Sequence, residues 1–135
     1  MEFRKQKSIY QQIADRLMDQ ILAGAPAEDE RMPSVRDVAA SMGVNPNTVM
    51  RSFDYLQGEG IIYNRRGVGY FASADAKEKI LAIQRQEFLD EELPLILQKM
   101  KLLGISIHGT GNLHNLSEAA DIPVVERLEI GYLRL

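Results

Sequence analysis

The sequence contains no cysteine and no tryptophan, and it has two histidines among its 135 residues. Without cysteine it has no disulfide framework, no thiolate nucleophile and no thiolate-ligated zinc. His108 and His114 are six positions apart, which matches metal ligands on neither a helix nor a strand, so we expect ordinary loop residues. No stretch approaches the roughly 20 apolar residues that cross a bilayer, and the first residues lack the apolar core of a signal peptide. These absences predict a cytoplasmic protein with no membrane partner, no metal and no cofactor.

Charged residues are mixed along the chain and form no basic domain. The 16 lysines and arginines are outnumbered by 19 aspartates and glutamates, which gives a net charge of −3. Binding to nucleic acid would therefore rest on a few well-placed arginines and would weaken with salt. Glu91 and Glu92 are typical of a solvated helix face, and Gly67 and Gly69 lack the rest of a dinucleotide fingerprint. Because no group of residues suggests acid–base catalysis, we expect no enzyme.

Apolar periodicity and capping residues predict three helices in the first part of the chain. The first spans residues 9–22, where apolar residues recur every three or four positions after a serine that fits a capping box. Residues 25–33 contain two prolines and an acidic run and are predicted to be a loop. A serine cap starts a second helix that a glycine ends at residue 43. The third, over residues 45–57, starts at once with an asparagine cap and a proline in its first turn.

From residue 61 onward the pattern changes to that of strands. Two short runs, IIYN and VGYFA, are joined by the glycine-containing turn RRG, which predicts a small β-hairpin. Residues 1–74 thus have the element order of a winged helix-turn-helix domain, mainly α with one hairpin.

Residues 75–135 are predicted to form a helical extension with an unassigned tail at 104–135. An apolar stripe runs from Ile80 to Leu103, and Pro94 is expected to kink or break the helix because it cannot donate to the carbonyl of Asp90. The tail contains a possible helical turn near residues 117–120 and an apolar end. The stripe could fold back on its own winged helix as core. We favour a dimer interface, because a helix-turn-helix reader needs a two-fold partner.

The first turn of the third helix carries the polar residues that would read DNA. Asn45 and Asn47 can pair with adenine or phosphate, Thr48 can contact phosphate or a thymine methyl, and Arg51 can reach guanine or phosphate. Arg36, near the start of the second helix, could hold a phosphate. Taken singly, each residue could instead be a helix cap or a solvated surface charge.

The tip of the hairpin carries Arg65, Arg66 and Gly67, which a winged helix would place against the DNA backbone or the narrow groove. The helix caps, the glycine turn, the arginine-bearing helix and the basic hairpin tip follow one another in the order of a winged helix-turn-helix domain. This combination favours DNA binding over the separate explanations for each residue.

These motifs resemble the GntR family of bacterial transcription regulators over residues 8–73. The matching segments are Pro33-Ser34-x-Arg36, Gly43-Val44-Asn45-Pro46-Asn47-Thr48-Val49, Leu56 with Glu59-Gly60-Ile61-Ile62, and Arg65-Arg66-Gly67-x-Gly69-Tyr70-Phe71. The resemblance implies a winged helix in which the following positions contact DNA: Arg36, Asn45, Asn47, Thr48, Arg51, Arg66 and Gly67. Many members have an arginine at the position of Met50, so this chain keeps only Arg51 of that pair.

The short extension is similar to that of the YtrA-type subgroup, because only 60 residues follow the wing. The resemblance implies a homodimeric regulator, expected to be a repressor, that binds double-stranded DNA at an inverted-repeat operator and often controls transporter genes. It leaves open whether a small-molecule effector exists. The alternative is a winged helix that serves as a protein-interaction module without sequence-specific DNA binding. Arg36, Arg51 and Arg66 speak against it, because such a module would gain nothing from arginines at both groove-facing sites.

Overall fold

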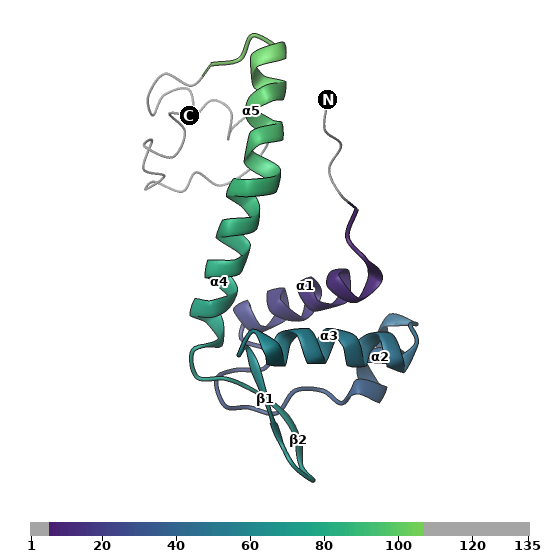
Figure 1. Ribbon diagram of the computed structural model, residues 1–135. Coiled ribbons are helices and arrows are strands. Elements are labelled where there is room, and N and C mark those ends of the chain that lie inside the picture. Colours follow the sequence, from purple (N-terminus) through teal and green to yellow (C-terminus); the bar gives the residue numbers. More distant parts are fainter. Residues whose placement is uncertain (1–5, 107–135) are drawn as a thin grey trace. The chain divides into compact units, whose positions relative to one another are not determined.

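The computed structural model describes residues 6–106, and the chain divides into two compact units between Leu89 and Asp90. The first unit contains most of the elements (Figure 1), which are α1 (Ile9–Leu22), α2 (Val35–Met42), α3 (Pro46–Gly58), β1 (Ile62–Arg65), β2 (Gly69–Ala72) and α4 (Ala76–Glu87). The π-helix η1 (Phe88–Glu92) spans the division, and α5 (Leu93–Leu102) belongs to the second unit. The fold is therefore mainly helical with one small hairpin, as predicted.

Local hydrogen bonds start the three helices where the sequence predicts them. The Ser8 hydroxyl accepts from the backbone N–H of Gln11 at 3.4 Å, and the Gln11 side chain accepts in return from the Ser8 N–H, so α1 begins with a capping box. Ser34 caps α2 by accepting from the N–H of Asp37 at 3.0 Å. Gly43 ends α2 in the left-handed conformation, with φ of 66°, which allows the N-cap of α3, Asn45, to follow two residues later.

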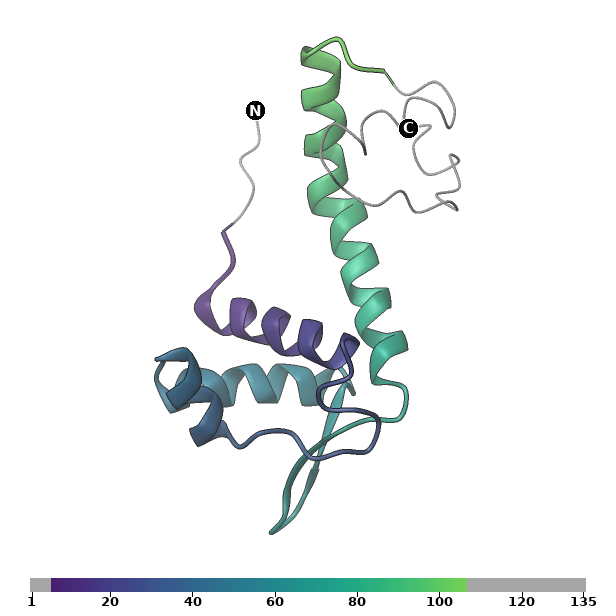
Figure 2. The ribbon, with the colours of Figure 1, turned by 180° about the vertical axis from the view of Figure 1, so that it is seen from behind.

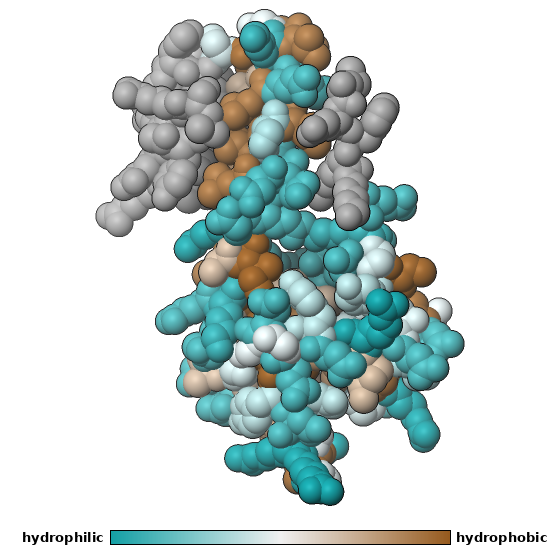
Figure 3. All heavy atoms as spheres, in the orientation of Figure 1, coloured by the Kyte–Doolittle hydropathy of each residue, from teal (hydrophilic) through white to brown (hydrophobic). Residues whose placement is uncertain are grey.

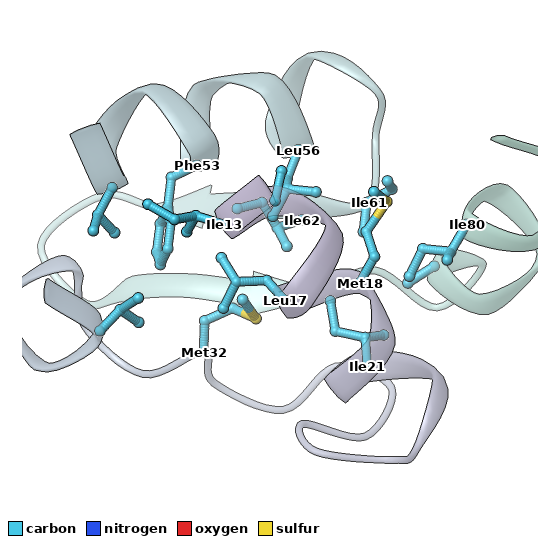
Figure 4. Packing of buried hydrophobic residues seen from close by; sticks show 14 of the residues in the cluster. Ile13, Leu17, Met18, Ile21, Met32, Phe53, Leu56, Ile61, Ile62 and Ile80 are labelled. Carbon is cyan, nitrogen blue, oxygen red and sulfur yellow. The ribbon is translucent and has the colours of Figure 1, made fainter. Parts of the chain in front are cut away.

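The hydrophobic core lies between α1, α3 and the hairpin (Figure 4). Phe53 and Leu56 of α3 are fully buried and pack in one cluster with Leu17 of α1. The same cluster includes Ala76 and Ile80, which are 2% and 0% exposed. The first turns of α4 thus complete the core of the winged helix.

This position of Ile80 corrects part of the interpretation of the apolar stripe. The sequence favours a dimer interface for the stripe from Ile80 to Leu103, yet Ile80 is core and Ile83 packs against the core from its edge. Packing therefore crosses the predicted boundary at residues 74 and 75. The functional division between residues 1–74 and 75–135 stays a prediction.

The hairpin is antiparallel and pairs Ile62 with Ala72 and Arg65 with Gly69. Residues 25–33 are more than the predicted loop, because Arg31 forms a β-bridge with Phe71 of β2. The wing therefore has a short third strand segment on the free edge of β2. Both views show the hairpin and α4 extending from opposite sides of the bundle of α1 to α3 (Figures 1 and 2).

The interruption predicted near Pro94 takes the form of the π-helix η1, directly before α5. A π-helical turn is wider than an α-helical one, so it accommodates a residue that cannot continue the regular hydrogen-bond ladder. Among residues 6–106, each helix is too short or too polar to cross a bilayer. The two histidines and almost all of the tail at 104–135 lie outside the described residues.

Candidate nucleic-acid interface

The N-terminal turn of α3 presents its polar side chains on the surface. The side-chain oxygen of Asn45 accepts from the backbone N–H of Asn47 at 2.8 Å, so Asn45 is the helix cap. Both asparagines are exposed, and Thr48 is half-buried. Within the described part of the chain, the side-chain amide nitrogen of Asn45 has no hydrogen bond. Capping therefore occupies only the oxygen and leaves the amide N–H groups able to donate to a base or phosphate.

Arg51 lies one turn further along α3 and is exposed, and a residue of α1 supports it. The guanidinium carbon of Arg51 lies 4.4 Å from the centroid of the Tyr10 ring, a cation–π contact. Directly beside this pair, the buried Ser52 donates from its hydroxyl to the backbone carbonyl of Tyr10 at 2.7 Å. The two contacts fix α3 against the start of α1, so the arginine is held by a rigid frame.

The wing carries Arg65, Arg66 and Gly67 at its exposed tip. The backbone N–H of Val68 donates to the carbonyl of Arg65 at 2.9 Å and closes the turn. Gly67 has φ of 80°, a conformation that residues with a Cβ rarely adopt. The guanidinium carbon of Arg65 lies 5.1 Å from the centroid of the Phe71 ring. Figure 3 shows the strongly hydrophilic wing tip at the bottom of the molecule.

The positive charges of these elements are not neutralised within the described residues. The ion pairs there join Lys7 with Asp15 and Glu87, and Lys79 with Asp75. None of them involves Arg36, which is exposed in the first turn of α2, or the arginines of α3 and the wing. The structure thus places exposed arginines on three elements, each able to donate to phosphate oxygens.

Three residues near this surface are not among the predicted DNA-contact residues. Tyr10 belongs to the apolar stripe of the helix predicted over residues 9–22, and that periodicity assigns it no role beside Arg51. Arg31 falls in a segment predicted to be a loop. Met50 is 41% exposed, and its sulfur lies 4.0 Å from the hydroxyl of Tyr70 on the wing. Of the three, only Arg31 could have been identified from the sequence. It lies shortly before α2, and basic residues beside a helix-turn-helix are candidates for phosphate contact.

Comparisons with known proteins agree with this arrangement. Residues 9–71 match the family model described as bacterial regulatory proteins, gntR family. The HTH-type transcriptional regulator YhcF of Bacillus subtilis is 32% identical over 105 residues, which are 78% of this chain and 85% of that protein. The HTH-type transcriptional repressor YtrA of the same organism is 32% identical over 108 residues, 80% of this chain and 77% of that protein.

A solved structure is also similar over most of its length. A transcriptional regulator of the GntR family from Bacteroides thetaiotaomicron has a TM-score of 0.69 and 41% identity, and the match covers 84% of this chain and 99% of that one. The matches to the two Bacillus subtilis regulators, 105 and 108 residues long, are longer than the winged helix alone. The chain belongs to the gntR family of bacterial regulatory proteins.

Proposed function

We propose that the protein is a homodimeric transcription repressor that binds double-stranded operator DNA with its winged helix. The observation that carries the proposal is the set of exposed arginines on α2, α3 and the wing, none of which has an ion pair within the described residues. Arginine is the side chain best suited to bidentate contact with phosphate or guanine.

In this proposal α3 reads bases and the other elements hold the backbone. The turn from Asn45 to Thr48 enters the major groove, with Asn45 and Asn47 donating from their amide nitrogens and Thr48 contacting a phosphate or a thymine methyl. Arg51, supported on Tyr10, reaches a guanine or the phosphate beside it.

Two other elements supply backbone contacts. Arg36 donates to a phosphate from the first turn of α2, whose N-terminus also favours negative charge. Arg65, Arg66 and Gly67 bring the wing tip to the backbone or the minor groove. Gly67 has a left-handed backbone and no side chain, so the turn at this tip is narrow.

Dimerisation would let two such winged helices bind the two halves of an inverted repeat. Exposed apolar side chains on α5 support a contact there, since Ile96 is 45% and Leu102 is 77% exposed. Figure 3 shows hydrophobic side chains gathered on this helix. The repressor role is carried over from YtrA, which is named a transcriptional repressor.

Selection of bound sequences from a random pool of duplexes tests the proposal. The full chain should enrich an inverted repeat, and Arg51→Ala should bind the enriched duplex at least about fivefold more weakly. Arg85→Ala is the matched control, because Arg85 is also an exposed arginine but lies on α4, which is not one of the elements assigned to the interface. Unchanged binding by Arg51→Ala would remove Arg51 from the interface, whereas no enrichment at all would favour the protein-interaction module instead.

A further inference from the structure

The segment directly before α2 is a structural part of the wing. The backbone N–H of Met32 donates to the carbonyl of Tyr70 at 2.7 Å, and the N–H of Ala72 donates to the carbonyl of Glu30 at 3.0 Å. Together with the bridge between Arg31 and Phe71, these bonds pair the segment with β2. Its backbone is therefore hydrogen-bonded to the free edge of β2.

The pairing determines which side chains share a face of the wing. Residues that pair across antiparallel strands point to the same side, and so do residues two apart on one strand. Arg31, Arg65, Gly69 and Phe71 therefore share one face. The residues that alternate with them along the three segments point to the opposite face. Three of those residues are buried in the core: Met32, Ile62 and Ala72. The face with the two arginines is thus the outer face of the wing.

Gly69 leaves the space that the Arg31 side chain occupies. A Cβ at position 69 would lie 3.0 Å from Nε of Arg31 and 3.3 Å from its Nη2. The guanidinium group therefore lies against the backbone of β2, directly beside the turn that carries the wing tip. Arg65 pairs with Gly69 across the hairpin, and its guanidinium lies over the ring of Phe71.

Neither of these two guanidinium groups has an ion pair with a carboxylate in the part of the chain that the structure describes. The two acidic residues before Arg31 have other partners: Asp29 accepts a hydrogen bond from the hydroxyl of Tyr63 at 3.0 Å, and Glu30 accepts one from the backbone N–H of Ala27 at 3.2 Å. Arg31 is exposed, as is Arg65. Two exposed positive charges thus share one face of a rigid, backbone-bonded element.

We infer that Arg31 is a further DNA-binding residue, which contacts the phosphodiester backbone together with Arg65 from the outer face of the wing. The inference deepens the proposed function and rests on it. The contact would connect the phosphates bound by the wing tip to those bound at the start of α2, since Arg31 lies in the strand segment that leads directly into that helix.

A structural role for Arg31 in packing against Gly69 is separable from a role of its charge. Arg31→Met keeps an unbranched apolar stem over Gly69 and removes the charge, whereas Arg31→Lys keeps the charge. Arg85→Met, on α4, is the matched control for losing one exposed arginine.

The experiment titrates the full chain and these variants with two 30-base-pair duplexes at several salt concentrations. One duplex has a random sequence, and the other is the sequence enriched by the wild-type protein. We expect Arg31→Met to bind both duplexes several-fold more weakly and to reduce the slope of log affinity against log salt by about one, with Arg31→Lys close to wild type.

Equal affinity and slope for Arg31→Met and Arg85→Met would overturn the inference while leaving the proposed function intact. An equal loss in Arg31→Lys and Arg31→Met would also overturn it, because the loss would then come from packing. If the wild-type protein binds neither duplex, the proposed function itself fails.

Discussion

Arg51 on α3 lies over the ring of Tyr10 on α1, with 4.4 Å between the guanidinium carbon and the ring centroid. The contact joins the two helices at the end of α3 that we assign to the major groove. Because the next residue, Ser52, also bonds the carbonyl of Tyr10, the start of α1 serves as the support of the reading helix. In the proposed function, recognition of DNA by Arg51 would therefore depend on Tyr10, a residue that itself needs to touch no DNA.

Replacing Tyr10 with leucine should weaken binding to the enriched duplex by about 0.5–1 kcal/mol, the usual contribution of an exposed cation–π contact. Binding to random DNA should change less, since the charge of Arg51 remains. Tyr10→Phe keeps the ring and is the control. A fluorescence anisotropy titration measures both. If leucine and phenylalanine behave alike, the ring does not orient Arg51.

Residues that read bases should differ from residues that hold the backbone. Thr48→Ala or Arg51→Ala should cost about 1–3 kcal/mol mainly on the enriched duplex, whereas Arg66→Ala should weaken binding to both duplexes and reduce the salt slope by about one. Titrations at several salt concentrations distinguish the two patterns. Equal losses on both duplexes for every variant would mean that specificity comes from DNA shape.

The exposed apolar side chains of α5 should hold the dimer. Ile96→Asp places a charge where an interface would exclude water, so it should shift the protein to monomer at tens of micromolar. Gln98→Asp adds the same charge at another exposed position of the helix and should leave the dimer intact. Sedimentation velocity of the full-length variants measures the change. If Ile96→Asp and Gln98→Asp both remain dimeric, the interface lies elsewhere.

Lys7 should stabilise the attachment of α4 to α1 through its ion pairs with Asp15 and Glu87. Partial burial lowers the pKa of Lys7, but hydrogen bonds and charge attraction from the two carboxylates outweigh it and raise the pKa above 10.5. A raised lysine pKa stabilises the folded state fully below pH 10.5, and this contribution disappears as the pH rises through the folded-state value.

Lys7→Met should therefore lower the free energy of unfolding by at most about 1 kcal/mol near neutral pH, because these ion pairs are still accessible to solvent. The difference from wild type should shrink above pH 10.5. Lys77→Met, which removes an exposed lysine of α4 without an ion pair in the described residues, is the control in urea unfolding. A difference that stays constant with pH would exclude the ion pairs as its cause.

Local signals predicted the helices and the hairpin well because each of them depends on nearby residues. Ser8, Ser34 and Asn45 cap the helices that follow them, and Gly43 takes the left-handed conformation that ends α2. The assignment of the polar and basic residues near these starts to a DNA interface follows from the order of the elements and stays a prediction.

Contacts between distant segments could not be predicted in this way. The pairing of Arg31 with Phe71 joins residues 40 positions apart and leaves no periodic pattern in either segment. Ile80 shows the same limit, because an apolar helical stripe has the same spacing whether it packs on its own domain or on a partner. The support of Arg51 by Tyr10 also depends on the crossing of α1 and α3, which sequence spacing does not specify.

The central claim is that this winged helix binds one DNA sequence in preference to others. Its most direct test is the ratio of the dissociation constants of the wild-type protein for random DNA and for the enriched duplex, measured by competition at physiological salt. The account predicts a ratio of at least about 10³, the lower range for specific regulators. A ratio near one would contradict it.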